Sequence, residues 1–512
     1  MVVSCIETKF DVIPITLNPS VQRLILSSNR IRSVDASFQF YGELRFVDLS
    51  KNHLVSIPHN SFEAQKKLTE LHLNKNKISL ITNSTFLGLI QLTVLNLRGN
   101  FLEELGPKQF QHLMSLEELD LGENRLSKLS MDCFSGLSKL RVLYIDDNQL
   151  MAVPTSSLMQ LSSLAELRVG LNAFNTLPDD IFRGLSKLSV LDVRSSNLAN
   201  ISDNAFRGLS TLRSLSLADN RFRSIPTRSL TTLTRLEDLK IGQNPFESLQ
   251  TGDFTGLYNL RSLEIEGAPD LERIEHGSLS ENRNLESLFL ISNKKLFEIE
   301  ENALTGLPKL KTLVLRDNAF TTFSESMVNW SEMRRVDVSK NPLKCSCQLL
   351  WLHTLLRSRE DPSIPADPDT RGSTTSGHQH PTSQVLCDTP PSFKDRSLRA
   401  LSVEELGCAS SDSKTQVVLI VCLVVLLVVV LAALALTLRF RRRVRDALKD
   451  PPRWFPSRSA SGAAIARKEH EYQKAQLGCV EDDYMIRAAA VSAANNVHGY
   501  GPGIKPIPVT EL

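Results

Sequence analysis

An asparagine that recurs every 23 to 25 residues constrains the fold of this 512-residue chain more than any other feature. Each one lies in the frame L-x-x-L-x-L-x-x-N-x-L, as in residues 116–126. The series is Asn29, Asn52, Asn76, Asn100, Asn124, Asn148, Asn172, Asn220, Asn244, Asn293, Asn318 and Asn341. Ser196 and Ala268 hold the asparagine position in two further copies, which makes fourteen repeats. We therefore expect one stacked, repetitive domain.

This frame is the signature of a leucine-rich repeat, so the expected fold is an α/β solenoid, a horseshoe of about 14 repeats of about 24 residues. The alternating leucines point into the core of a short strand and the residues between them face solvent. The asparagine amide both donates and accepts, so it can satisfy the backbone groups that a tight coil leaves unpaired. The second half of each repeat carries another apolar anchor, which we expect to form a second spine. These anchors are Phe62, Phe86, Phe110, Phe134, Phe182, Phe206 and Phe254, with Leu158, Leu230, Leu279 and Leu304 in other repeats.

A run of 22 uncharged, mostly aliphatic residues at 417–438 predicts one transmembrane helix. Five arginines between Arg439 and Arg445 follow it directly. By the positive-inside rule the C-terminal side is cytoplasmic, which predicts a type I, single-pass protein of the plasma membrane with an extracellular solenoid. The expected domains are the solenoid at 21–344, a cysteine-rich cap at 345–408, a juxtamembrane linker at 409–416, the transmembrane helix at 417–438 and a disordered cytoplasmic tail at 439–512.

The first twenty residues have neither a basic start nor an apolar stretch long enough for a signal peptide. An ectodomain of this size needs one to cross a membrane. Residues 1–20 are therefore expected to be the remnant of a truncated N-terminal cap, with the signal peptide missing.

Four cysteines, Cys345, Cys347, Cys387 and Cys408, follow the last repeat directly. They resemble the C-terminal cysteine-rich cap of extracellular leucine-rich repeat proteins. Three pairings are possible, and the resemblance implies Cys345 with Cys387 and Cys347 with Cys408. Disulfides suit an extracellular position, although a C-x-C pair is also compatible with half of a zinc site.

The solvent-facing side of the strands is the expected binding surface. Fourteen strands at about 4.8 Å each span roughly 60 Å, enough for a standard protein interface. We expect an acidic patch around Tyr144, flanked by Arg98 and Arg168, and an apolar patch farther along. The expected partner-binding residues are Glu118, Asp120, Tyr144, Asp146, Arg168, Phe289, Ile291 and Val314. The alternative interpretation is that these charges only keep a solenoid soluble.

Modification and tail motifs are consistent with this topology. The sequons at Asn83, Asn200 and Asn329 all follow the strand of their repeat, so glycans there would leave the concave face open. The ending with Thr510 and Leu512 fits capture by a PDZ domain, and Tyr484 beside three acidic residues is a phosphorylation candidate. Chance occurrence is the alternative for each.

The sequence contains none of the catalytic motifs that would indicate an enzyme. It contains no phosphate-binding loop and no nucleophile elbow, and the His-Glu pair at 470–471 meets lysine where a zinc protease needs a second histidine. The net charge of +2 argues against a nucleic-acid partner. We expect no enzyme activity, no cofactor and no metal.

Several segments resemble the insect leucine-rich repeat transmembrane recognition proteins of the Capricious and Tartan type. They are residues 11–50, VLYIDDNQL (142–150), EYQKAQ (471–476), DDYMIRAA (482–489) and KPIPVTEL (505–512). The tail segments are not dictated by repeat physics, which makes the resemblance specific, whereas the absent signal region and the long insertion at 360–384 depart from it. The resemblance implies heterophilic cell-surface recognition in cell sorting or neuronal targeting, with a protein partner on another cell. The alternatives are a cis regulator and a receptor for a secreted or pattern ligand.

Overall fold

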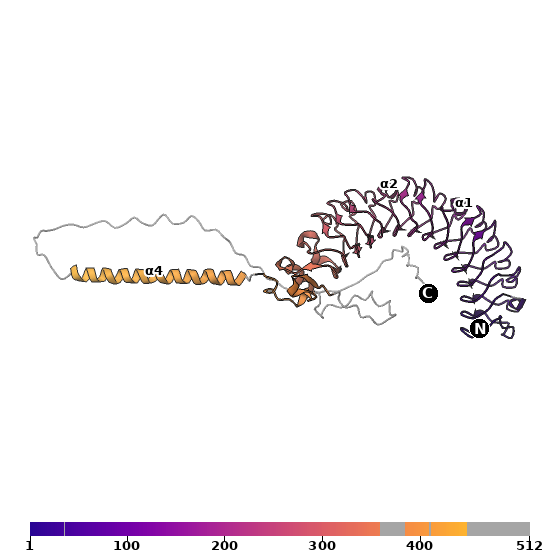
Figure 1. The fold of residues 1–512 in the computed structure, drawn as a ribbon, viewed down its shortest axis with the longest axis horizontal. Coiled ribbons are helices and arrows are strands. Elements are labelled where there is room, and N and C mark those ends of the chain that lie inside the picture. Colours follow the sequence, from indigo (N-terminus) through magenta and orange to yellow (C-terminus); the bar gives the residue numbers. More distant parts are fainter. Residues whose placement is uncertain (35, 359–383, 409–410, 448–512) are drawn as a thin grey trace, which may run out of the picture. The chain divides into compact units, whose positions relative to one another are not determined.

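One parallel sheet runs through the first of two units, Met1–Cys422 and Leu423–Leu512, into which the internal contacts divide the chain (Figure 1). The computed structural model describes residues 1–34, 36–358, 384–408 and 411–447. The sheet has fifteen strands in chain order within these residues and lines the inner side of the coil. Its strands are β1 (Val2–Ser4), β2 (Arg23–Ile25), β3 (Phe46–Asp48), β4 (Glu70–His72), β5 (Val94–Asn96), β7 (Glu118–Asp120), β9 (Val142–Tyr144), β10 (Glu166–Arg168), β12 (Val190–Asp192), β14 (Ser214–Ser216), β15 (Asp238–Lys240), β17 (Ser262–Glu266), β19 (Ser287–Ile291), β21 (Thr312–Val314) and β22 (Arg335–Asp337).

The predicted solenoid is confirmed, and β1 adds a strand that the repeat frame did not predict. Neighbouring strands pair in register, so equivalent residues of successive repeats lie side by side, as Leu119 does beside Leu143. The middle residue of each three-residue strand points inward; Leu95, Leu119 and Leu143 are fully buried. Residues at the same position of successive repeats therefore form rows across the sheet.

The asparagines form the expected ladder between repeats. Asn124 Nδ2 donates to the carbonyl oxygens of Leu97, Leu121 and Gly122, and its Oδ1 accepts from Leu102 N. The first and last of these bonds join it to the preceding repeat. Each ladder position is preceded by a residue with positive φ, which closes the coil tightly enough for the amide to reach both repeats.

The outer side of the coil is built from short elements over the second apolar spine. All eleven predicted spine residues are buried, and neighbouring rings stack, as in Phe86–Phe110 and Phe110–Phe134. The helices of this side are α1 (Thr155–Leu158), α2 (Thr227–Leu230) and the 3-10 turns η1 (Ala36–Phe40), η2 (Glu325–Met327) and η3 (Trp330–Glu332). Its strands are β6 (Glu104–Leu105), β8 (Lys128–Leu129), β11 (Thr176–Leu177), β13 (Asn200–Ile201), β16 (Ser248–Leu249), β18 (Arg273–Ile274) and β20 (Glu298–Ile299).

A disulfide-bonded cap follows the last repeat. It contains the disulfides Cys345–Cys387 and Cys347–Cys408, the pairing that the resemblance implied. The ring of Trp330, in the last repeat, packs 4.9 Å from that of Trp351 in the cap, so the apolar core continues across the junction. The elements of the cap are β23 (Leu343–Lys344), η4 (Cys347–Leu349), α3 (Leu350–Ser358), β24 (Cys387–Thr389), η6 (Pro391–Phe393) and η7 (Leu398–Ala400).

The long helix α4 (Ser411–Ala447) contains the predicted membrane span. Its apolar part, Val417–Arg441, contains an 18-residue stretch with a mean hydropathy of 3.7 and packs against no other described element. The helix begins at Ser411 and so includes most of the expected linker at 409–416. Its length and composition suffice to cross a bilayer.

Candidate functional site: the concave sheet

Two rows of side chains face outward from the concave sheet, because the first and third residues of each strand point away from the core. The first outward row includes Glu70, Val94, Glu118, Val142, Glu166 and Val190, in this order across neighbouring strands. The second outward row includes His72, Asn96, Asp120, Tyr144, Arg168 and Asp192. We refer to these two rows by these names below.

The most tightly bonded group on this face surrounds Arg98, which follows β5. Its Nη2 and Nη1 lie 2.8 and 3.3 Å from the two carboxylate oxygens of Asp146, and its Nε lies 3.0 Å from Glu123. Asp120 lies 3.4 Å from Nη1 and also accepts a hydrogen bond from Gly122 N. Burial lowers the pKa of Arg98, but Asp146 and Asp120 outweigh it and raise the pKa overall. This guanidinium therefore stays charged and ties three repeats together.

The structure corrects the expectation that Asp120 and Asp146 are exposed contacts for a partner. Both are buried, because the Arg98 side chain crosses the sheet and covers them. Burial raises the pKa of Asp120, against the opposing effects of the Gly122 N–H and Arg98. A partner would meet Arg98 and the exposed Glu123 first.

Tyr144, Glu166 and Arg168 form a second bonded group. The Tyr144 hydroxyl donates to Glu166 Oε1 at 3.1 Å, and Arg168 Nη2 lies 2.8 Å from the same oxygen. The Arg168 guanidinium also lies 4.5 Å from the centre of the Tyr144 ring. Burial and then Glu166 raise the pKa of Tyr144, so the phenol stays protonated. Tyr144 is half-buried, with both its hydroxyl and its ring in contact with neighbours, and its role as a partner-binding anchor stays a prediction.

The apolar patch farther along is smaller than predicted. Phe289 and Ile291 are half-buried on β19, one of the two five-residue strands. Val314 was expected to be exposed and is 2% exposed. It pairs in register with Phe289 on the neighbouring strand, so Val314 is buried on the outward side of the sheet beside that residue. Two residues of the predicted patch, not three, remain available to a partner.

The three sequon asparagines are exposed and lie outside the fifteen-stranded sheet. Asn83 lies in the turn after β4, Asn200 in β13 of the outer side, and Asn329 directly before η3. Their glycosylation stays a prediction. Thr510, Leu512 and Tyr484 lie outside the described residues.

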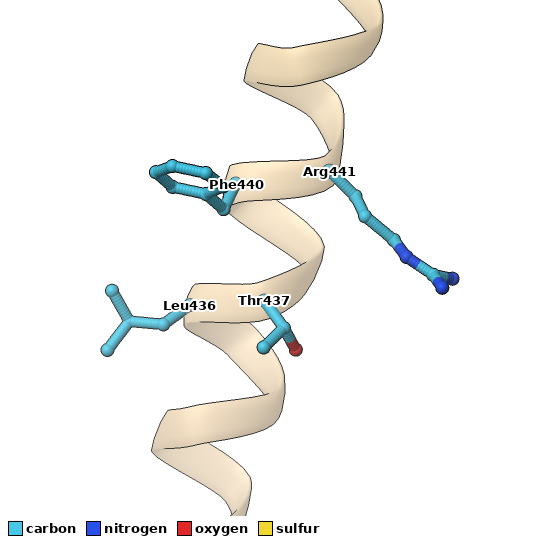
Figure 2. A pocket seen from close by; sticks show the side chains of 4 residues that line it. All are labelled: Leu436, Thr437, Phe440 and Arg441. Atoms are coloured by element: carbon cyan, nitrogen blue, oxygen red, sulfur yellow. The ribbon is translucent and has the colours of Figure 1, made fainter. Parts of the chain in front are cut away.

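Side chains also surround a shallow hollow on α4 (Figure 2). Leu436 and Phe440 project from one side of the helix, one turn apart, while Arg441 points away from them. The Thr437 hydroxyl donates back to Leu434 O. A single apolar helix cannot enclose a ligand, so this hollow is not a candidate binding site.

Sequence reasoning missed how Arg98 reaches Asp146, 48 residues away. Gly122 is the sequence feature that allows this contact. A Cβ at that position would lie 2.9 Å from Arg98 Cζ and overlap Nη1. Glycine is therefore the residue that lets a long side chain cross the sheet at this point.

The family model described as "Leucine rich repeat" matches residues 42–101, 90–150, 162–222, 210–269 and 271–343, which is more than half of the chain. The chain belongs to the leucine-rich repeat proteins. An 88-residue stretch is 35% identical to the high affinity nerve growth factor receptor of Rattus norvegicus. That stretch covers 17% of this leucine-rich repeat protein and 11% of the receptor, so the chain matches a small part of its relative.

Solved structures of other leucine-rich repeat proteins are similar over most of the solenoid. A protein of Leptospira interrogans has a TM-score of 0.55 at 26% identity, over 66% of this chain and 82% of that one. The crystal structure of the TLR13–ssRNA13 complex has a TM-score of 0.53 at 25% identity, over 67% of this chain and 57% of that one. The Drosophila Toll–Spätzle complex, at 18% identity and a TM-score of 0.51 over 76% of this chain and 61% of that one, shows the fold alone.

Proposed function

We propose that this protein is a single-pass cell-surface receptor of the Capricious and Tartan type, with its solenoid extracellular, that recognises a protein on another cell. The observation that carries the proposal is the continuous concave sheet, whose outward rows hold half-exposed aromatic, aliphatic and charged groups. The apolar helix, the disulfide-bonded cap and the receptor relative support a surface position. We propose no enzyme activity and no cofactor, since the face is a recognition scaffold.

A protein partner fits this face better than a nucleic acid does. The outward rows of β4 to β10 carry four carboxylates and one guanidinium group, and Arg98 is held by three carboxylates, of which Asp120 is one of these four. A polyanion would be repelled here, because nucleic-acid binding depends on neutralising phosphates with basic groups. The RNA of the TLR13 complex therefore does not transfer to this chain. In the tail, Thr510 and Leu512 are proposed to bind a PDZ adaptor, and Tyr484 to be phosphorylated.

A glycan wedge tests the use of the concave face. Asp192→Asn with Arg194→Thr creates a sequon on the second outward row and removes a pair whose charges balance each other. The matched control is Lys128→Asn, which creates a sequon on β8 at the repeat position that Asn200 occupies in β13. Asn83, Asn200 and Asn329 are the proposed natural glycan sites, and all lie off this face.

Cells that display the full chain are mixed with cells of the native tissue, and aggregation is counted. We expect the wild type and Lys128→Asn to aggregate with the tissue cells and the wedge variant to lose aggregation. Aggregation that survives a glycosylated wedge would exclude the concave face. Self-aggregation of displaying cells would favour a homophilic role, and no aggregation with correct display would favour a cis regulator or a receptor for a secreted ligand.

A further inference from the structure

Glu118 is a half-buried carboxylate of the concave face that nothing bonds to, whereas Asp238, another unbonded carboxylate of this face, is exposed. The side chain of Glu118, in the first outward row, has no hydrogen-bond or ion-pair partner among the described residues. Its neighbours differ: Asp120 is bonded to Arg98 and Gly122, and Glu166 to Arg168 and Tyr144. Carboxylates that are half-buried cost free energy unless they are paired, so the free protein leaves this cost unbalanced at Glu118.

Glu118 is partly shielded from solvent and is surrounded by other acidic side chains. Burial raises its pKa, and the negative charges of Asp120, Glu166 and Glu70 raise it further, against a weaker effect of Arg168. Glu70 is also loosely held, because the nearest side-chain nitrogen, His72 Nε2, lies 3.7 Å from its carboxylate. A partner that brings positive charge to this part of the sheet would therefore relieve two carboxylates at once.

Strand register defines where that charge fits. Val94 pairs with Glu70 on one side and Glu118 on the other. At about 4.8 Å per strand the two glutamates start roughly 10 Å apart, so a cation above Val94 lies about 5 Å from each. A divalent metal ion is excluded as the occupant, because it needs several oxygens at about 2.3 Å. A long basic side chain fits, since its methylene stem can cover Val94 while its charged end meets the carboxylates.

We propose that a lysine or arginine side chain of the protein partner docks over Val94, between Glu70 and Glu118. The proposal rests on the function proposed above and names the partner chemistry of that face. Docking pairs the free carboxylate, buries the half-exposed valine and adds complementary charge at the strand rows where the sheet is most acidic.

The test uses the full chain in lipid nanodiscs and, as the probe, a random peptide library displayed on phage. Peptides selected on the wild type are sequenced, synthesised and titrated against three variants. Glu118→Gln removes the charge and keeps the shape. Val94→Lys fills the position with the protein's own ammonium group. Glu104→Gln removes a charge from β6, on the outer side, and is the matched control.

We expect the selected peptides to be enriched in lysine and arginine, and to bind Glu118→Gln and Val94→Lys about tenfold more weakly than the wild type. Glu104→Gln should leave the affinity unchanged. No enrichment in basic residues, or equal affinity for Glu118→Gln and the wild type, would overturn the proposal. If the peptides bind Glu118→Gln normally but lose binding to the glycan wedge variant, this proposal fails while the concave face still binds protein. If they also bind the glycan wedge variant normally, the proposed function fails as well.

Discussion

Replacing one ladder asparagine by alanine should loosen the solenoid locally, and the structure gives the size of the effect. The variant is Asn124→Ala. It removes the bonds from Nδ2 to the carbonyl oxygens of Leu97, Leu121 and Gly122, and the bond that Oδ1 accepts from Leu102 N. These four bonds do not count equally, because some of the groups have a second partner.

The three carbonyl oxygens each keep a second donor, supplied by Asn100 Nδ2, Asn148 Nδ2 and Gly99 N. The Leu102 N–H has no other acceptor among the described residues. One buried N–H left unpaired costs about 1–3 kcal/mol, and each weakened carbonyl adds about 0.5 kcal/mol. We therefore expect a loss of about 3 kcal/mol in local stability, which corresponds to about a hundredfold change in an opening equilibrium.

Hydrogen–deuterium exchange read by mass spectrometry is the appropriate assay, because long repeat arrays do not unfold in two states. Peptides covering residues 97–126 should exchange about a hundredfold faster in Asn124→Ala than in the wild type. Asn175→Ala is the control, since Asn175 is an exposed asparagine without a side-chain bond among the described residues. Equal exchange in the two variants would refute the claim that the ladder stabilises the coil.

Three further variants test other features. Gly122→Ala should displace the Arg98 guanidinium and expose the carboxylates beneath it, lowering local stability by about 2 kcal/mol in the same exchange assay. Glu118→Gln should raise local stability in the exchange assay at neutral pH but not at acidic pH. The raised folded-state pKa of Glu118 means that the folded protein binds more protons, so stability falls as pH rises through that window and the charge removed is an unfavourable one. Serine at both Cys347 and Cys408 opens a 61-residue loop and should cost about 4 kcal/mol, seen as faster proteolysis of the cap.

For each of these variants, one outcome would contradict the prediction. Gly106→Ala is the control for Gly122→Ala, because its added Cβ would meet nothing closer than 3.6 Å; equal effects would mean that Arg98 is not displaced. A stability loss at neutral pH in Glu118→Gln would show that this carboxylate has a favourable partner. Unchanged proteolysis would show that the Cys345–Cys387 disulfide suffices to hold the cap.

The sequence predicted those parts of the fold that depend on period and residue type. The leucine frame and the asparagine series defined the buried positions and the ladder, since a buried leucine or a bridging amide has the same role in every repeat. Exposure on the concave face was less predictable. Val314 is covered, and Asp146 lies beneath Arg98, a residue two repeats earlier in the chain. Such contacts depend on the length of one side chain and on a nearby glycine. Neither feature recurs from repeat to repeat, so the repeat pattern does not predict them.

The in-register pairing of the strands makes the concave face a ruler. Seven strand steps separate β7, which carries Glu118, from β19, which carries Phe289. At about 4.8 Å per step the two positions lie roughly 34 Å apart along the sheet. Removing or adding one whole repeat between them would change this separation by about 5 Å and leave both local environments intact. A partner that contacts both positions would then bind only if the spacing of its own contact groups matches this separation. That separation changes in steps of one strand spacing, which the backbone hydrogen bonds of the sheet determine.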